Sequence, residues 1–239
     1  MRYRAIATDY DGTLAEDGHV RPETLEALLR VRRSGRKLVL VTGRELDDLM
    51  RVCPDLDVFD RVVAENGALL YTPTPPTERP LARPPPPAFV AALEARGVAP
   101  ISCGRIIVAT WQPHEQAALA VIRAMGLELE VIFNKGAVMV LPSGVNKATG
   151  LTAALQEIGV PREHVVGVGD AENDHSLLGA CGLGVAVANA VPALQKRADL
   201  IMTQPNGRGV VEICDMLIGT DLAGVEKARP IELDPTGTR

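Results

Sequence analysis

One short stretch near the start of the chain constrains its fold more than any other. Residues 4–14 run Arg-Ala-Ile-Ala-Thr-Asp-Tyr-Asp-Gly-Thr-Leu, an apolar segment that ends abruptly in two aspartates and a glycine. Such a segment is typical of a buried parallel strand. Asp9 would then lie at the strand's carboxyl end, where open α/β sheets bind ligands. Gly12 gives the backbone the freedom to turn away, so we expect a site at the end of this strand.

The two carboxylates of this stretch, Asp9 and Asp11, are one residue apart on a turn and can face one small site. One of them can attack a substrate as a nucleophile while the other transfers a proton. Their like charges repel unless a cation or unequal protonation relieves the repulsion. An acidic surface turn after an edge strand is the alternative, and the rest of the chain has to decide between the two.

The pattern that follows alternates strands and helices. A helix is expected from Pro22 to the Gly35 stop, strands at 37–41 and 61–64, and a helix at 45–50 between them. The same alternation returns over 148–218. This order predicts an α/β fold with a doubly wound, mostly parallel, Rossmann-like sheet.

The middle of the chain has a different pattern. Residues 72–87 are proline-rich and end in four consecutive prolines, which favours an extended connector, with an SH3-type ligand as the alternative. The segment beyond it indicates a small α+β insert with an antiparallel sheet, including strands at 105–111, 127–133 and 137–141. We therefore expect a catalytic core at 1–71 and 144–218, an inserted cap at 72–143, and a polar tail or linker at 219–239.

Composition limits the classes of partner. The net charge is -5 and no basic tract is concentrated, which disfavours nucleic acid. The N-terminus lacks a signal-peptide pattern, and no apolar run is long enough to cross a membrane. Four scattered cysteines without C-x-x-C spacing indicate reduced thiols. We expect a cytoplasmic monomer or homodimer that acts on a small molecule.

Two further elements suit an anionic substrate. Thr42 and Gly43 end the second strand, where a hydroxyl and a backbone N–H can hold phosphate oxygens; an ordinary helix-capping turn is the alternative. Arg44 either adds charge near the substrate or is exposed. Lys147 begins a helix, where the helix dipole disfavours a cation. A nearby phosphate and carboxylates would explain its position, and a solvated lysine is the alternative.

A last element follows the strand expected at 164–168. Asp170, Asn173 and Asp174 lie in the segment Gly-Asp-Ala-Glu-Asn-Asp, directly after that strand. This spacing places several oxygen ligands at one strand end. Oxygen ligands together with water suit Mg²⁺.

In their order along the chain, these four elements resemble the four motifs of the haloacid dehalogenase (HAD) superfamily of aspartate-nucleophile phosphohydrolases, over Arg2 to about Ile218. The resemblance implies that Asp9 is the nucleophile, that Asp11 is the acid and base, and that Lys147 bridges nucleophile and phosphate. It also implies ligands for the substrate phosphate, namely Thr42, Gly43, Arg44, Lys147 and Asn173. The implied Mg²⁺ ligands are Asp9, Asp11, Asp170 and Asp174, with Asp174 acting through water or by steadying Lys147.

The position of the insert, between the second and third motifs, resembles the Cof-type (class IIB) group. The segment Glu65-Asn66-Gly67-Ala68 is also similar to that group. The small cap resembles the phosphoglycolate-phosphatase-like branch, and other members act on sugar phosphates. Specificity is then expected from polar cap residues, with the 134–136 turn best placed to reach the core; the candidates are Arg105, His114, Asn134 and Lys135.

The predicted function is Mg²⁺-dependent hydrolysis of a small phosphorylated metabolite, a sugar phosphate or phosphoglycolate, through an aspartyl-phosphate. A phosphomutase of the phosphomannomutase type and a non-catalytic regulatory HAD module are the alternatives. A generic nucleotide-binding domain is disfavoured because the chain has neither G-x-G-x-x-G nor a P-loop.

Overall fold

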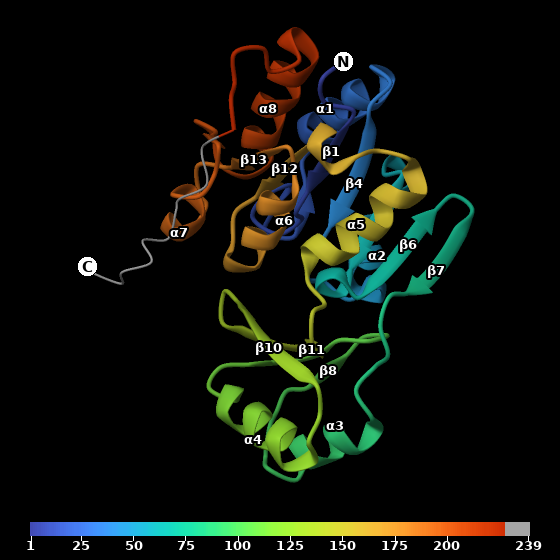
Figure 1. Cartoon of the computed structure of the whole chain (residues 1–239), viewed down its shortest axis with the longest axis vertical. Helices are drawn as coiled ribbons and strands as arrows, with labels where there is room; N and C mark the ends of the chain where they lie inside the picture. Colours follow the sequence, from blue (N-terminus) through green and yellow to red (C-terminus); the bar gives the residue numbers. More distant parts are fainter. Residues whose placement is uncertain (228–239) are drawn as a thin grey trace.

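A large sheet organises the structure of this chain (Figure 1). The structure is a computed structural model, and it describes residues 1–227. Its eight strands follow the order β14-β13-β12-β1-β4-β5-β6-β7, and all neighbours are parallel except the pairs that involve β6 and β7. The strands are β1 (Ala5–Thr8), β4 (Lys37–Val41), β5 (Arg61–Ala64), β6 (Leu69–Pro73), β7 (Pro76–Pro80), β12 (Val165–Gly169), β13 (Leu183–Ala186) and β14 (Leu200–Ile201). The predicted doubly wound α/β core is confirmed.

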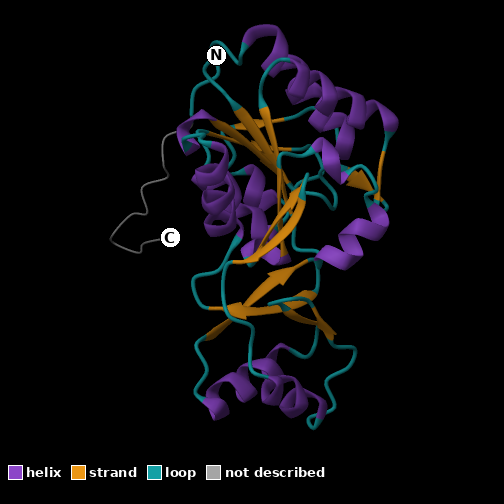
Figure 2. Ribbon diagram, turned by 90° about the vertical axis from the view of Figure 1, so that its right-hand side faces the viewer, coloured by secondary structure: helices purple, strands orange, loops and turns teal. Residues whose placement is uncertain are grey.

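Helices cover both faces of this sheet (Figures 1 and 2). The period-two alternation of β1 sends Ile6 toward one helical layer and Ala5 and Ala7 toward the other, and all three are fully buried. One layer contains α1 (Pro22–Arg33), α2 (Leu46–Val52) and α8 (Asn206–Thr220). The other contains α5 (Lys147–Ile158), α6 (His175–Ala180) and α7 (Pro192–Gln195). Burial on both faces explains why β1 is continuously apolar until Thr8.

The first part of the proline-rich segment, up to residue 80, is not the extended connector that the sequence indicated; residues 81–86, which lack helix and strand, connect the core to the cap. Residues 69–80 form a hairpin in which β7 pairs along β6, so the boundary expected at 71/72 falls inside β6. Pro76 and Pro80 are tolerated because β7 is the exposed edge strand of the sheet. The chain leaves the core only after β7.

The cap is a separate α+β layer inserted between β7 and α5. Its antiparallel sheet has the order β10-β11-β9-β8, formed by β8 (Ser102–Cys103), β9 (Val108–Trp111), β10 (Leu129–Asn134) and β11 (Ala137–Pro142). Figure 2 shows this sheet facing the core, while α3 (Pro87–Glu94) and α4 (Glu115–Met125) cover its far side. The cap therefore presents a sheet surface, not its helices, to the catalytic core.

Short elements complete the described chain. A hairpin joins β2 (Ala15–Glu16) to β3 (His19–Val20), and the 3₁₀ turns are η1 (Leu56–Val58), η2 (Glu65–Gly67), η3 (Arg162–His164) and η4 (Glu172–Asp174). The predicted tail begins inside α8, and Leu222 beyond it is buried in the core. The rest of the predicted tail, 228–239, lies outside the described residues. Within residues 1–227, no helix combines the length and apolarity needed to cross a bilayer.

Candidate active site

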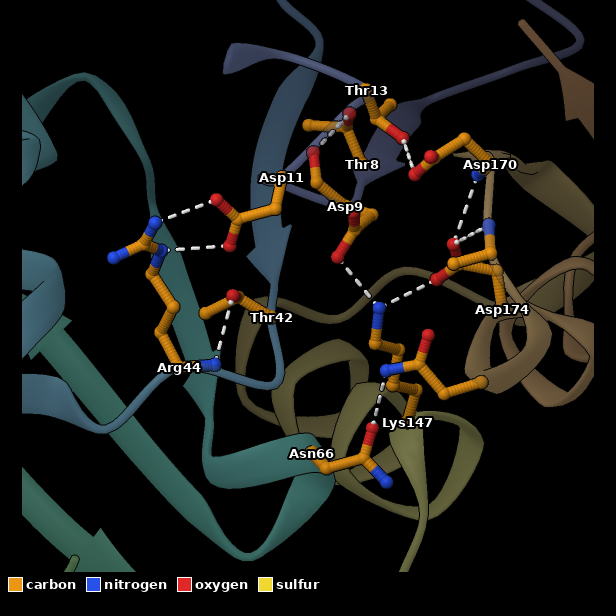
Figure 3. A network of polar contacts seen from close by, with 12 residues as sticks. Thr8, Asp9, Asp11, Thr13, Thr42, Arg44, Asn66, Lys147, Asp170 and Asp174 are labelled. Atoms are coloured by element: carbon orange, nitrogen blue, oxygen red, sulfur yellow. Dashed lines mark hydrogen bonds and ion pairs between the residues drawn. The ribbon is translucent and has the colours of Figure 1, made fainter. Parts of the chain in front are cut away.

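The carboxyl end of β1 carries a buried ion pair at the centre of the candidate site (Figure 3). The Lys147 ammonium donates hydrogen bonds to Asp9 Oδ1 and to Asp174 Oδ1, both at 2.6 Å. Lys147 is only 1% exposed and Asp174 is fully buried. Residues distant in the sequence thus meet because β1, α5 and the loop after β12 open at the same sheet edge.

Burial dominates the electrostatics of this group. Desolvation raises the pKa of Asp9 to about 8, although the Lys147 ammonium opposes the shift. Desolvation disfavours the ammonium of Lys147, but the Asp174 and Asp9 carboxylates outweigh it and raise the pKa of Lys147 above its usual range. The lysine is therefore a permanent buried cation that favours the ionised form of the carboxylate beside it.

The start of α5 fixes this lysine. Asn146 caps the helix, and its Oδ1 accepts hydrogen bonds from the amides of Ala148 at 3.0 Å and Thr149 at 3.2 Å. Thr149 Oγ1 accepts in return from the Asn146 amide at 3.0 Å. This capping box holds Lys147 in the first helical turn, against the helix dipole, where the two carboxylates compensate the cost.

The loop after β12 supplies two further carboxylates with different surroundings. Asp174 Oδ2 accepts the amides of Asp170 and Ala171, both at 2.9 Å, so both of its oxygens are engaged within the protein. Asp170 instead accepts from Thr13 Oγ1 at 2.9 Å and from the Lys135 ammonium at 2.6 Å. Burial raises the pKa of Asp170.

These carboxylates form a group that suits a metal ion. Ligand oxygens of Asp9, Asp170 and Asp174 all lie within 4.8 Å of one another. Buried carboxylates gathered this closely need a cation to offset their repulsion, and carboxylate oxygens are ligands that Mg²⁺ accepts. The donor set therefore fits a hard divalent cation.

Asp11 lies apart from that group. Its carboxylate accepts two hydrogen bonds from Arg44, from Nε and Nη2, both at 2.7 Å, and Figure 3 shows it turned toward this guanidinium. Arg44 also pairs with Asp48, and its amide donates to Thr42 Oγ1 at 3.1 Å. The turn after β4 thus connects the second carboxylate of the first motif to the residues expected to hold phosphate.

A cavity of about 540 Å³ lies between the core and the cap. Asp9, Asp11, Gly43 and Arg44 line it from the core, whereas Thr42, Lys147 and the loop after β12 lie deeper. The cap contributes a mainly apolar wall, made by Pro100, Ile101, Ile107, Ala109, Trp111, Ala137 and Met139, together with Ser102, Thr110, Asn134 and Lys135.

The structure separates the four polar cap candidates. Lys135 reaches the core, where its ammonium lies 3.2 Å from the Asp11 carbonyl oxygen and 2.6 Å from Asp170 Oδ2, and Asn134 lines the cavity beside it. Arg105 does not line the cavity, because its guanidinium pairs with Asp47 and Glu78. His114 Nε2 contacts the Ala99 carbonyl instead of the cavity.

Sequence reasoning assigned no task to Glu65 and Asn66. Asn66 Oδ1 accepts a hydrogen bond from Asn173 Nδ2 at 2.9 Å, and Asn173 Oδ1 is buried without a hydrogen-bond partner among the described residues. Glu65 is fully buried. The available signal was the acidic-amide-glycine sequence directly after a buried strand, where an apolar residue would otherwise be expected.

Comparison with known proteins agrees with this geometry. Residues 6–83 and 116–213 match the family described as haloacid dehalogenase-like hydrolase. The phosphoglycolate phosphatase of Methanothermobacter thermautotrophicus is 29% identical over 224 residues, which cover 90% of this chain and 99% of that protein. Phosphoglycolate phosphatase 2 of Saccharolobus solfataricus is 31% identical over 219 residues, covering 89% of this chain and 91% of the relative.

Solved structures share the fold. A haloacid dehalogenase-like hydrolase from Bacteroides thetaiotaomicron superposes with a TM-score of 0.75 at 22% identity, covering 90% of this chain and 99% of that one. A sugar phosphatase of HAD subclass IIB gives a TM-score of 0.70 at 20% identity, covering 83% of this chain and 93% of that one.

Proposed function

Because this chain belongs to the haloacid dehalogenase-like hydrolases and is a Cof-type phosphatase, we propose that it hydrolyses a small phosphorylated metabolite, a sugar phosphate or phosphoglycolate, through an aspartyl-phosphate on Asp9. The observation that carries the proposal is the buried Lys147 ammonium, 2.6 Å from Asp9 Oδ1, at the base of an open cavity. A carboxylate held in this way has an oxygen available for attack on phosphorus.

In the first step an Asp9 oxygen forms a bond to phosphorus while the bond to the leaving oxygen breaks. Asp11 gives a proton to that oxygen, and the leaving group departs as an alcohol. Water then attacks the aspartyl-phosphate, Asp11 accepts its proton, and inorganic phosphate and the Asp9 carboxylate are released. Asp11 must turn from Arg44 to do this, so substrate binding draws the guanidinium toward the substrate anion.

Other core residues hold the phosphate. The Thr42 hydroxyl and the Gly43 amide lie at the strand end beside Asp9, and the Lys147 ammonium is already within reach of the transferred group. The Asn173 Nδ2 group, an amide donor, is fixed next to them by its hydrogen bond to Asn66 Oδ1. These donors need little rearrangement, because the surrounding hydrogen bonds already fix them.

Mg²⁺ is the proposed cofactor, held by Asp9, the Asp11 carbonyl and Asp170, with Asp174 supporting the site from behind. When bound it supplies positive charge that lets an anionic carboxylate approach an anionic phosphate. Asp174 contributes mainly by holding Lys147 and the Asp170 amide, because both of its oxygens are engaged there.

We further propose a division into a catalytic core of residues 1–80 and 144–227 and a cap between them, with the cavity at their boundary. The two relatives named phosphoglycolate phosphatase support the small-metabolite class. The substrate's leaving group would meet the apolar cap wall and the Asn134–Lys135 turn.

Phosphate release from a panel of sugar phosphates, phosphoglycolate, nucleotides and an aryl phosphate, with Mg²⁺ or with EDTA, tests this function. Asp9→Asn should reduce kcat by at least about 10⁴-fold, since it removes the nucleophile. Asp17→Asn, an exposed aspartate nearby whose positive φ suits asparagine, should match the wild type. Release that survives Asp9→Asn would reject the aspartyl-phosphate, and a requirement for a sugar bisphosphate activator would indicate a mutase.

A further inference from the structure

The turn that follows β5, residues Glu65–Gly67, holds the cap through a buried carboxylate. Glu65 Oε1 accepts the amide of Arg105 at 2.7 Å, and Oε2 accepts the amides of Ile106 at 2.7 Å and Ile107 at 2.9 Å. Hydrogen bonds to an ionised acceptor are about twice as strong as neutral ones, and these are shielded from water. They also explain why the strand expected at 105–111 begins only at Val108: the preceding amides bond to this carboxylate.

The backbone of the same turn contacts the catalytic loops. The Glu65 amide donates to the Arg44 carbonyl and the Asn66 amide to the Thr42 carbonyl, both at 2.9 Å. A Cβ on Gly67 would lie 2.0 Å from the Asn146 carbonyl oxygen, so the turn also packs tightly against the start of α5. Residues 65–67 therefore contact the turn after β4, the start of α5 and the cap.

The turn adopts an unusual backbone conformation to do this. Glu65 and Asn66 have φ values of 53° and 55°, in the left-handed region that side chains other than glycine seldom adopt. Such conformations persist where surrounding contacts over-determine them, and they cluster at functional sites. Here the conformation directs the Glu65 side chain toward the cap and the Asn66 side chain toward Asn173.

We propose that Glu65 is a positioning residue that fixes the substrate-facing cap sheet relative to the catalytic carboxylates; the inference rests on the proposed phosphatase function. The amides it holds lead directly into β9, and β9 pairs with β11 in the register Trp111 to Ala137 and Val108 to Val140. β11 begins at the turn that carries Lys135. Displacing these amides therefore displaces the apolar wall and the cap turn whose Lys135 reaches Asp170.

The kinetic test distinguishes the contact that Glu65 makes to the cap from the contact that Asn66 makes to Asn173. Glu65→Gln keeps the side chain's size but turns an N–H group toward amide donors, so kcat/KM for the best panel substrate should fall about 10-fold or more. Acetyl phosphate, whose leaving group is too small to need the cap, should stay within about 3-fold of the wild type. Asn66→Gly, which keeps the positive φ but removes the contact to Asn173, should lower both substrates together.

A second variant approaches from the cap. A Cβ on Gly104 would lie 2.5 Å from Glu65 Oε1, so Gly104→Ala should reproduce the selective loss without altering any core residue. Asp47→Asn is the matched control, because it removes an exposed cap-to-core ion pair with Arg105 and leaves the carboxylate bonds intact. It should change neither substrate by more than about 2-fold.

Amide hydrogen exchange supplies a readout that needs no turnover. Amides 105–107 should exchange at least about 10-fold faster in Glu65→Gln than in the wild type, with β1 and β12 unchanged, and Asp47→Asn should leave them protected. Unchanged exchange in folded Glu65→Gln would overturn the proposal. Equal loss on both substrates in Glu65→Gln and in Gly104→Ala would overturn it as well. A wild type that hydrolyses nothing would reject the proposed function alone, because exchange still decides whether the carboxylate holds the cap.

Discussion

The two walls of the cavity differ in chemistry: the core wall carries charged side chains, and the cap wall is mainly apolar. On the core side the charged groups at and behind the wall include almost fully buried ones: Asp9 is 5% exposed, Lys147 1% and Asp174 0%, whereas Asp11 and Arg44 on the wall are partly exposed. On the cap side the wall is largely apolar, and its most prominent member, Trp111, is 54% exposed. The core side is therefore a network of charges, and the cap side is largely apolar, with Ile107 and Met139 buried in it.

This difference leads us to expect chemistry from the core and substrate selectivity from the cap. A buried charge requires specific partners, so changing one core residue leaves others unpaired. An apolar wall leaves no charge unpaired when one of its residues changes, so we expect its exposed members, such as Trp111, to vary at smaller cost. The family match agrees, since it omits residues 84–115, which include α3, β8 and β9 of the cap. On the proposed function, we therefore expect the core to determine the reaction and the cap to determine which leaving group is accepted.

The comparison predicts its largest effect on stability at Lys147. Lys147→Met removes the only charge that both Asp9 and Asp174 contact within the described structure, and should lower the free energy of unfolding by about 3–5 kcal/mol. Denaturant unfolding in EDTA measures this, because no metal can then replace the ammonium.

Lys37→Met is the matched control. Lys37 also pairs with an aspartate, Asp60 at 2.8 Å, but its side chain is 46% exposed, so the loss should be at most about 1 kcal/mol. Equal losses in the two variants would show that burial does not distinguish the core network from an ordinary surface pair.

Most of the core could be predicted from the sequence for the same physical reason. Buried parallel strands are continuously apolar, so a carboxylate directly after one, as at Asp9 and Asp170, is conspicuous. Lys147 was conspicuous because a helix start disfavours a cation. What the sequence did not show was which way each side chain turns: Asp11 faces Arg44, and Asp174 has both oxygens engaged within the protein.

The cap was less predictable because its contacts are set by tertiary structure. The 134–136 turn was the cap segment expected to reach the core, and Lys135 does contact Asp170 there, whereas Arg105, another polar candidate, pairs with Asp47 and Glu78. The proline-rich hairpin was missed since local composition favoured an extended connector, while the open edge of β6 offered a strand partner. The ion pairs of Arg105 and the pairing of β7 with β6 have no local sequence signal.

Lys135 is one of the points where the two walls touch, and it sharpens the comparison. Its ammonium contacts the Asp11 carbonyl and Asp170 Oδ2, the atoms proposed to bind Mg²⁺, so metal and lysine compete for them. Lys135→Gln should therefore raise the affinity of the substrate-free protein for Mg²⁺ by about 10-fold, as calorimetry would measure.

Arg123→Gln provides the control for charge alone. It removes one exposed positive charge from α4, on the far side of the cap, and should change the Mg²⁺ affinity by less than about 2-fold. If both variants bind Mg²⁺ like the wild type, the cap lysine does not occupy the metal's place, and the two walls act independently in the substrate-free protein.

The smallest effect concerns the end of the core, in the segment where the sequence predicted a loose tail. Partial burial opposes ionisation of Asp221, but the Arg2 amide and the Arg36 guanidinium, the latter at 2.7 Å, outweigh it and hold the pKa of Asp221 below its usual 3.8. A folded-state pKa below the unfolded-state pKa stabilises the protein at pH values above the unfolded-state pKa, and this contribution disappears as pH falls through the folded-state pKa.

At pH 7, Asp221→Asn should therefore lower the melting temperature by about 2 °C, and the difference from the wild type should shrink below about pH 4. Thermal unfolding across pH measures it. A constant difference at every pH would mean that these residues pack on the core without using the charge, so that ionic contacts stabilise the catalytic edge of the sheet and not its far end.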